Sequence, residues 1–214
     1  MLFLTFGLSL MSVNRKDAAI RALSTLMGIA IITQIIHQVL VYKEPDQYTV
    51  FHIYSLFEYP LYLIYYFRVL KMDEHPSDSS NKTFKRILII SFIIYVLFFI
   101  IYYTLIVSIE KKSFGYVSAL NGFFVTSLSL YCYYDTIKKG KVANILFHPH
   151  FYIVTANFIF FSLQIPILSL DQFFLDVHSQ WRETFINIYK VLNFVLYGLY
   201  CIGLCINQWE KKKS

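Results

Sequence analysis

The sequence predicts an all-α integral membrane protein, a single helical bundle over residues 1–214. The chain is 57% hydrophobic and only 15% charged, whereas a soluble domain carries about 25% charge. Its apolar residues form seven continuous runs separated by short polar links. Runs of about 20 residues suit membrane helices, since barrel strands are about half as long and alternate. The runs are 1–12, 18–42, 50–70, 87–109, 116–137, 151–170 and 184–207.

The first run differs from the other six in length. Twelve helical residues reach only about 18 Å, which is short for a bilayer. Residues 1–12 also lack the basic start and small-residue cleavage site of a signal peptide. We therefore expect seven transmembrane helices, with six as the alternative. The remaining runs are each long enough to span, and together they leave no room for a separate soluble domain.

The basic residues predict the orientation of the bundle. Alternate links place fourteen Lys and Arg on one side and four on the other, and Lys190 inside a span completes the nineteen. Cytoplasmic loops carry the excess of Lys and Arg. The C-terminus is therefore expected in the cytoplasm, and with seven spans the N-terminus lies outside. The net charge of +6 follows the links, so it does not indicate nucleic-acid binding.

The positions of the aromatic residues agree with this predicted topology. Trp181 and Trp209 bracket the last run, where indoles favour the headgroup level. Two groups of tyrosines lie toward the inner ends of the third and fifth runs, and we expect them to form an interfacial belt. The groups are Tyr62, Tyr65 and Tyr66, and Tyr131, Tyr133 and Tyr134.

Polar residues within the runs gather toward the outer surface. Glu58 lies eight residues in from the outer edge of its run, and Lys190 lies eight residues from Arg182, so both sit about 12 Å deep. Ionisable groups in hydrocarbon are costly and often functional. Two readings remain open: a polar pocket facing outward, with Glu58 and Lys190 as its charged pair, or an ion pair and amides that hold helices together. The candidate ligand-binding residues are Glu58, Lys190, His37, His52, Tyr54, Asn121, Gln164, Asn187 and Asn193.

Several specific chemistries fit poorly. Lys190 in a seventh helix suggests a retinal Schiff base, but no Trp lies within a span to enclose a polyene. A zinc hydrolase needs three His, and only His37 and His52 share the outer half. We expect His148 and His150 to be solvated at the opposite surface. No residue is assigned as catalytic or metal-binding, and no cofactor is expected. Ser24 and Gly28 form one small-residue face of the kind that packs helices closely.

Three stretches carry a resemblance to a known group. They are His52–Tyr59, His148–Tyr152, and Asn187 through Tyr200. They resemble an uncharacterised group of small, about seven-helix membrane proteins from Bacteroidetes-type bacteria. Here His148 replaces the usual Asn before Pro149, and Lys190 stands where that group often has His. The resemblance implies a topology and a candidate site at His52, Tyr54 and Glu58, and it implies no reaction.

Together these patterns predict a bacterial inner-membrane sensor or accessory protein. It would bind a small or lipidic ligand in the outer pocket and act on a protein partner at its cytoplasmic side. Membrane lipids are expected partners, and a homo-oligomer is compatible with the pattern. Two alternatives stay open: a membrane effector or pore-type accessory of a bacterial defence system, and an intramembrane lipid-modifying enzyme that uses Glu58 and His52. An enzyme is the less favoured reading.

Overall fold

The computed structural model of the chain describes residues 1–12, 17–41, 48–71, 80–106, 115–138, 148–175 and 179–213, and these residues fold into helices without strands. The elements are α1 (Leu2–Ser12), α2 (Ala18–Val41), α3 (Tyr48–Lys71), α4 (Ser80–Ile101) continued by one π-helical turn η1 (Tyr102–Ile106), α5 (Gly115–Lys138), α6 (Pro149–Leu175) and α7 (Ser179–Lys213). Each predicted apolar run therefore corresponds to a helix, which confirms the all-α class.

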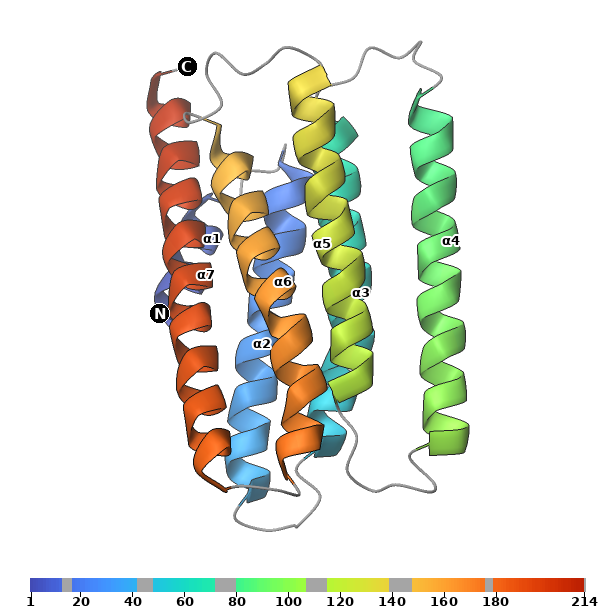
Figure 1. The fold of residues 1–214 in the computed structure, drawn as a ribbon. Helices are drawn as coiled ribbons and strands as arrows, with labels where there is room; N and C mark the ends of the chain where they lie inside the picture. Colours follow the sequence, from blue (N-terminus) through green and yellow to red (C-terminus); the bar gives the residue numbers. More distant parts are fainter. Residues whose placement is uncertain are drawn as a thin grey trace.

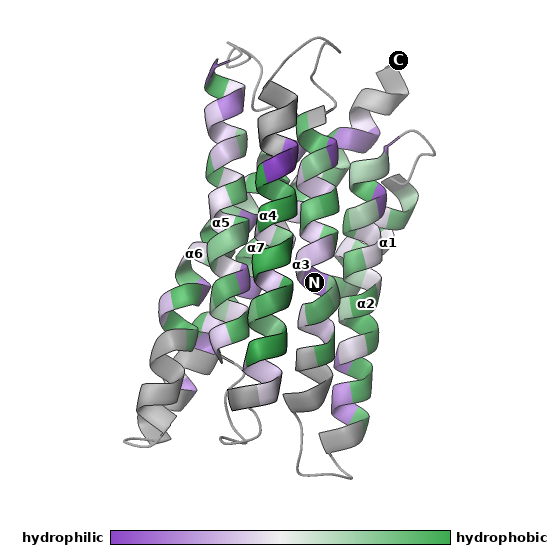
Figure 2. Ribbon diagram, turned by 90° about the vertical axis from the view of Figure 1, so that its right-hand side faces the viewer, coloured by the Kyte–Doolittle hydropathy of each residue, from purple (hydrophilic) through white to green (hydrophobic). Residues whose placement is uncertain are grey.

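Four of these helices are long and apolar enough to cross a membrane. Within the described residues the candidate spans are Ala18–Val39, Lys85–Thr104, Pro149–Leu168 and Asn187–Trp209. This is compatible with a membrane protein. Helices α3 and α5 are not among these candidate spans, although each has 24 residues. Their tyrosine and serine residues lower their mean hydropathy. Figure 2 shows apolar residues along the middle of α4 and hydrophilic ones toward its ends.

Six helices form a ring, and α4 lies outside it. Contacts run in the order α1, α2, α3, α5, α6, α7 and back to α1 (Figure 1). Helix α4 packs only lightly on α3 and α5, and just 17% of its span is buried. Its many exposed isoleucines would face lipid, where apolar surface is not penalised. The core consequently lies inside the ring.

Helix α1 covers only half the length of the ring. Its N-terminus lies midway along the bundle in both ribbon views, and its other end points toward the end where α7 finishes (Figures 1 and 2). We call that end of the bundle the C-terminal end, and the other the pocket end. Asp17 then caps α2 by accepting a hydrogen bond from the backbone N–H of Ile20 at 3.0 Å.

The small-residue face predicted at Ser24 and Gly28 receives α1. The Ser9 hydroxyl lies 2.7 Å from that of Ser24, and the ring of Phe6 fills the space that a side chain at Gly28 would need. On its other flank the hydroxyl of Thr5 lies 3.3 Å from the sulfur of Cys201. Helix α1 thus bridges α2 and α7.

Candidate ligand pocket

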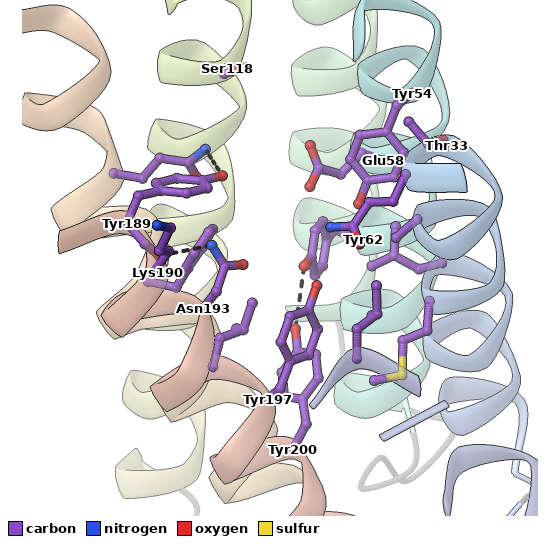
Figure 3. Close-up of a pocket in the computed structure, with 18 of the residues that line it drawn as sticks. Thr33, Tyr54, Glu58, Tyr62, Ser118, Tyr189, Lys190, Asn193, Tyr197 and Tyr200 are labelled. Atoms are coloured by element: carbon purple, nitrogen blue, oxygen red, sulfur yellow. Dashed lines mark hydrogen bonds between the residues drawn. The ribbon is translucent and has the colours of Figure 1, made fainter. Parts of the chain in front are cut away.

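A cavity of about 450 Å³ lies inside the ring (Figure 3). Helices α2 and α3 form one wall, α6 and α7 the other, while α1 and α5 each contribute one residue. This volume falls within the usual range for small-molecule sites. Its polar lining consists of Thr33, Gln34, Tyr54, Glu58, Tyr62, Ser118, Gln164, Tyr189, Lys190, Asn193, Tyr197 and Tyr200.

Glu58 is held by donors from two helices. The side-chain amide of Asn121, itself 1% exposed on α5, donates a hydrogen bond to a Glu58 carboxylate oxygen at 2.6 Å. The phenol of Tyr54, one turn earlier on α3, also hydrogen-bonds Glu58. A carboxylate with two fixed donors has a defined position in the cavity wall. Asn121 therefore contributes from behind Glu58, without lining the cavity itself.

Lys190 lies on the opposite wall. It projects from α7 and is exposed at the edge of the cavity, whereas Glu58 belongs to α3 (Figure 3). Among the described residues no ion pair joins the two, and the hydrogen-bond partners of Glu58 are Asn121 and Tyr54. The two charges thus share the pocket, but they do not neutralise each other across it.

Gln164 also lines this space, with an amide acceptor that has no partner. Gln164 on α6 is 7% exposed, and its Nε2 lies 3.4 Å from the Tyr189 hydroxyl. Its Oε1 is buried and has no hydrogen-bond partner. Asn193 donates to the backbone carbonyl of Tyr189 at 2.9 Å, within its own helix. The amide of Gln164 can therefore accept a hydrogen bond from a bound molecule.

The remaining predicted site residues are placed elsewhere or lie outside the description. His37 is half-buried on α2 and Asn187 is exposed on α7, and neither is among the residues that line the cavity. His52 belongs to α3, but its side chain is outside the described set. The structure thus brings together Glu58 and Lys190 with Tyr54, Gln164, Asn193 and, through its hydrogen bond, Asn121.

A buried hydrogen-bond network begins at the deep end of the cavity. The hydroxyls of Tyr62 and Tyr200 are 3.3 Å apart, and Tyr200 donates to the side-chain carbonyl of Asn157. Asn157 donates to the Tyr66 hydroxyl at 3.0 Å, and that hydroxyl lies 2.6 Å from the hydroxyl of Ser129. The network joins α3, α5, α6 and α7 and runs toward the C-terminal end.

This network corrects the predicted tyrosine belt. Tyr62, Tyr65 and Tyr66 are at most 3% exposed, so they form core contacts and not an interfacial ring. Position near the end of a run was a poor guide, because α3 turns these residues inward at i, i+3 and i+4. The prediction for His150 is also wrong: it is 4% exposed and its Nδ1 lies 3.2 Å from the Tyr65 hydroxyl. His148 is exposed, as expected.

Neither a metal site nor a similarity to known proteins indicates a function for the cavity. Within the described residues no group of three His, Cys, Asp or Glu side chains could hold a metal ion. No protein-family model, curated protein or solved structure matches the chain. The resemblance to the Bacteroidetes-type group stays a prediction.

Proposed function

We propose that this chain is a seven-helix sensor or accessory protein of a bacterial inner membrane, with its C-terminus in the cytoplasm. It binds a small ligand in the cavity of about 450 Å³ and acts on a cytoplasmic protein partner. The observation that carries the proposal is the cavity itself. It holds a positioned carboxylate and, within the candidate span Asn187–Trp209, an exposed ammonium, and unused charges are costly in a membrane.

The tyrosine network gives such a sensor a physical connection. Tyr62 and Tyr200 line the cavity and also belong to the network that reaches Asn157, Tyr66 and Ser129. A ligand that moves either phenol must lengthen or shorten bonds among four helices. Coupling of this kind needs contiguous groups with alternative arrangements. The network supplies the contiguity between the pocket and the C-terminal end.

The test changes the charge of Glu58 while keeping its shape. In cells of the native host, a proximity-labelling enzyme fused to the C-terminus would record neighbouring cytoplasmic proteins. We expect Glu58→Gln to alter the labelling pattern at equal protein abundance, because it removes the pocket charge. Glu183→Gln is the matched control, since Glu183 is exposed at the start of α7. Its labelling pattern should equal that of the wild type.

Two other outcomes would replace the sensor with the alternatives. Depolarisation of cells on overexpression, with labelling unaffected by Glu58→Gln, would indicate a membrane effector or pore. A lipid product that appears with the wild type and not with Glu58→Gln would indicate a lipid-modifying enzyme. Identical labelling for wild type and Glu58→Gln, with neither effect, would contradict a role for the pocket in sensing.

A further inference from the structure

Helix α1 completes the ring of helices in only one half of the bundle. Helix α1 packs against both α2 and α7, but α2 and α7 are not among the closely packed pairs of described helices. Because α1 begins midway along the bundle, it separates the interior from the outside only in the C-terminal half (Figure 1). Leu2, in its first turn, lines the cavity.

The cavity opens sideways in the half that α1 leaves uncovered. Gln34 on α2 and Lys190 on α7 both line the cavity and are both exposed, so they mark its two edges. Beside them the outer surface is apolar: Ile35 is 49% exposed and Val191 62%. In a bilayer such surface faces acyl chains. The opening therefore faces the hydrocarbon of one leaflet.

Along α2 and α7 the cavity lining changes from polar to apolar with depth. Gln34 and Lys190 lie toward the pocket end, and Leu26, Met27 and Leu196 lie toward the middle of the bundle. Tyr62 and Tyr200 add hydroxyls at the deep end, but these two hydroxyls already lie 3.3 Å from each other. Figure 3 shows Tyr54 and Ser118 toward one end and Tyr200 toward the other. A lipid in the same leaflet has the same orientation, with its head toward the surface and its chain toward the midplane. The cavity thus matches an amphiphile that slides in from the side.

Charge and hydrogen bonding specify the head. Hydrogen bonds from Asn121 and Tyr54 hold Glu58 but leave its negative charge on the α3 wall. An anion is therefore favoured only at the opposite wall, where among the described residues nothing pairs with the Lys190 ammonium. An anionic group would form an ion pair with the Lys190 ammonium. The buried Oε1 of Gln164 has no partner, so it requires a donor such as a hydroxyl. A head that carries both a phosphate and a hydroxyl meets both needs.

We propose that the cavity binds a single-chain anionic amphiphile of the monoacylglycerol phosphate class, which passes sideways from the leaflet between α2 and α7. Its phosphate pairs with Lys190, its hydroxyl donates to Gln164, and its acyl chain extends toward Leu26 and Met27. This inference rests on the proposed function, because it names the ligand of the same pocket.

Equilibrium binding of radiolabelled oleoyl lysophosphatidic acid to the full chain in phosphatidylcholine nanodiscs tests the proposal. The wild type should bind saturably. Lys190→Gln should weaken binding about tenfold or more, the usual cost of losing a charge-assisted bond. Lys190→Arg should retain it, which separates charge from misfolding. Lys85→Gln, an exposed lysine on α4, should leave binding unchanged.

A second pair of variants tests the location. Ala30 lines the cavity, so Ala30→Trp should fill it and abolish binding. Ile32 is 57% exposed on the outer face of the same helix, and Ile32→Trp should have no effect. Competition identifies the source of the ligand: monooleoylglycerol and glycerol phosphate should each compete poorly, since one lacks the charge and the other the chain. Glycerol phosphate competing as well as the labelled lipid would overturn access from the bilayer.

The two proposals fail in different ways. If the wild type does not bind the labelled lipid, or if Lys190→Gln binds as well as the wild type, the ligand class is wrong. The sensor would then survive provided that Glu58→Gln still alters C-terminal labelling. If the lipid binds as expected but neither Ala30→Trp nor Glu58→Gln alters labelling, the site is a lipid site and the sensing function is wrong.

Discussion

Replacing Asn157 with leucine should measure how strongly the tyrosine network holds the bundle together. Asn157 is fully buried on α6, and its amide bonds Tyr66 on α3 and Tyr200 on α7. Leucine has the same number of side-chain heavy atoms in a bulkier, tetrahedral arrangement, and it bonds neither hydroxyl. The substitution therefore removes two interhelical hydrogen bonds, and any cost of overpacking adds to their loss.

The magnitude follows from what each hydroxyl retains. Tyr66 keeps Ser129 at 2.6 Å and Tyr200 keeps Tyr62 at 3.3 Å, so neither is left without a partner. Interhelical hydrogen bonds in membranes average about 0.6 kcal/mol and reach about 1.7. Two such bonds give an expected loss of about 1–3 kcal/mol in the free energy of unfolding.

The assay is reversible unfolding in mixed SDS and detergent micelles, followed by circular dichroism. A double-mutant cycle with Tyr200→Phe should give a coupling energy of about 0.5–1.5 kcal/mol, because both variants break the same bond. Asn193→Leu is the control, since the amide of Asn193 bonds only a carbonyl of its own helix. Its expected cost is below about 0.5 kcal/mol. Additive effects of Asn157→Leu and Tyr200→Phe would refute a connected network.

Two further predictions concern helix contacts. A Cβ at Gly203 would lie 2.7 Å from a backbone oxygen of α6, so Gly203→Ala should lower the free energy of unfolding by about 1–3 kcal/mol in the SDS assay. Gly198 has open space around it, so Gly198→Ala should be neutral or stabilising. Equal free energies of unfolding for the two variants would show that α6 and α7 do not pack as described. Ser9→Ala removes the 2.7 Å bond to Ser24, so proteolysis or cysteine labelling of α1 should become faster while α4 is unaffected; unchanged rates would show that this bond does not hold α1.

The sequence predicts the helices well because hydrophobic length is a local property. It also places Glu58 and Lys190 at a common depth, since depth follows from counting residues along a run. Which side chains meet depends on the rotation of each helix and on its neighbours. In helices that are apolar on every face, hydropathy carries little information about either. The adjacency of α3 and α5, which gives Glu58 the amide of Asn121, could not be predicted for this reason.

The sequence also does not distinguish buried tyrosines from interfacial ones. A tyrosine near the end of an apolar run has the composition of an interfacial residue whether it faces headgroups or the core. Tyr134 is 59% exposed while Tyr66 is fully buried, although both lie in the last turns of their helices. The distinguishing feature is a partner on another helix, such as Ser129 for Tyr66. A single sequence does not reveal such pairs.

Among the described residues, Gln164 is the only cavity-lining side chain with a buried polar atom that has no hydrogen-bond partner, and this indicates where a ligand acts. In the C-terminal half, buried hydroxyls and the Asn157 amide bond one another. In the pocket half, the Oε1 of Gln164 is buried without a partner, which costs about 1–3 kcal/mol. A ligand that supplies the donor recovers this energy and stabilises the pocket half selectively. Tyr62 and Tyr200 line the cavity and also belong to the network, so a change in the pocket reaches the network through these two phenols.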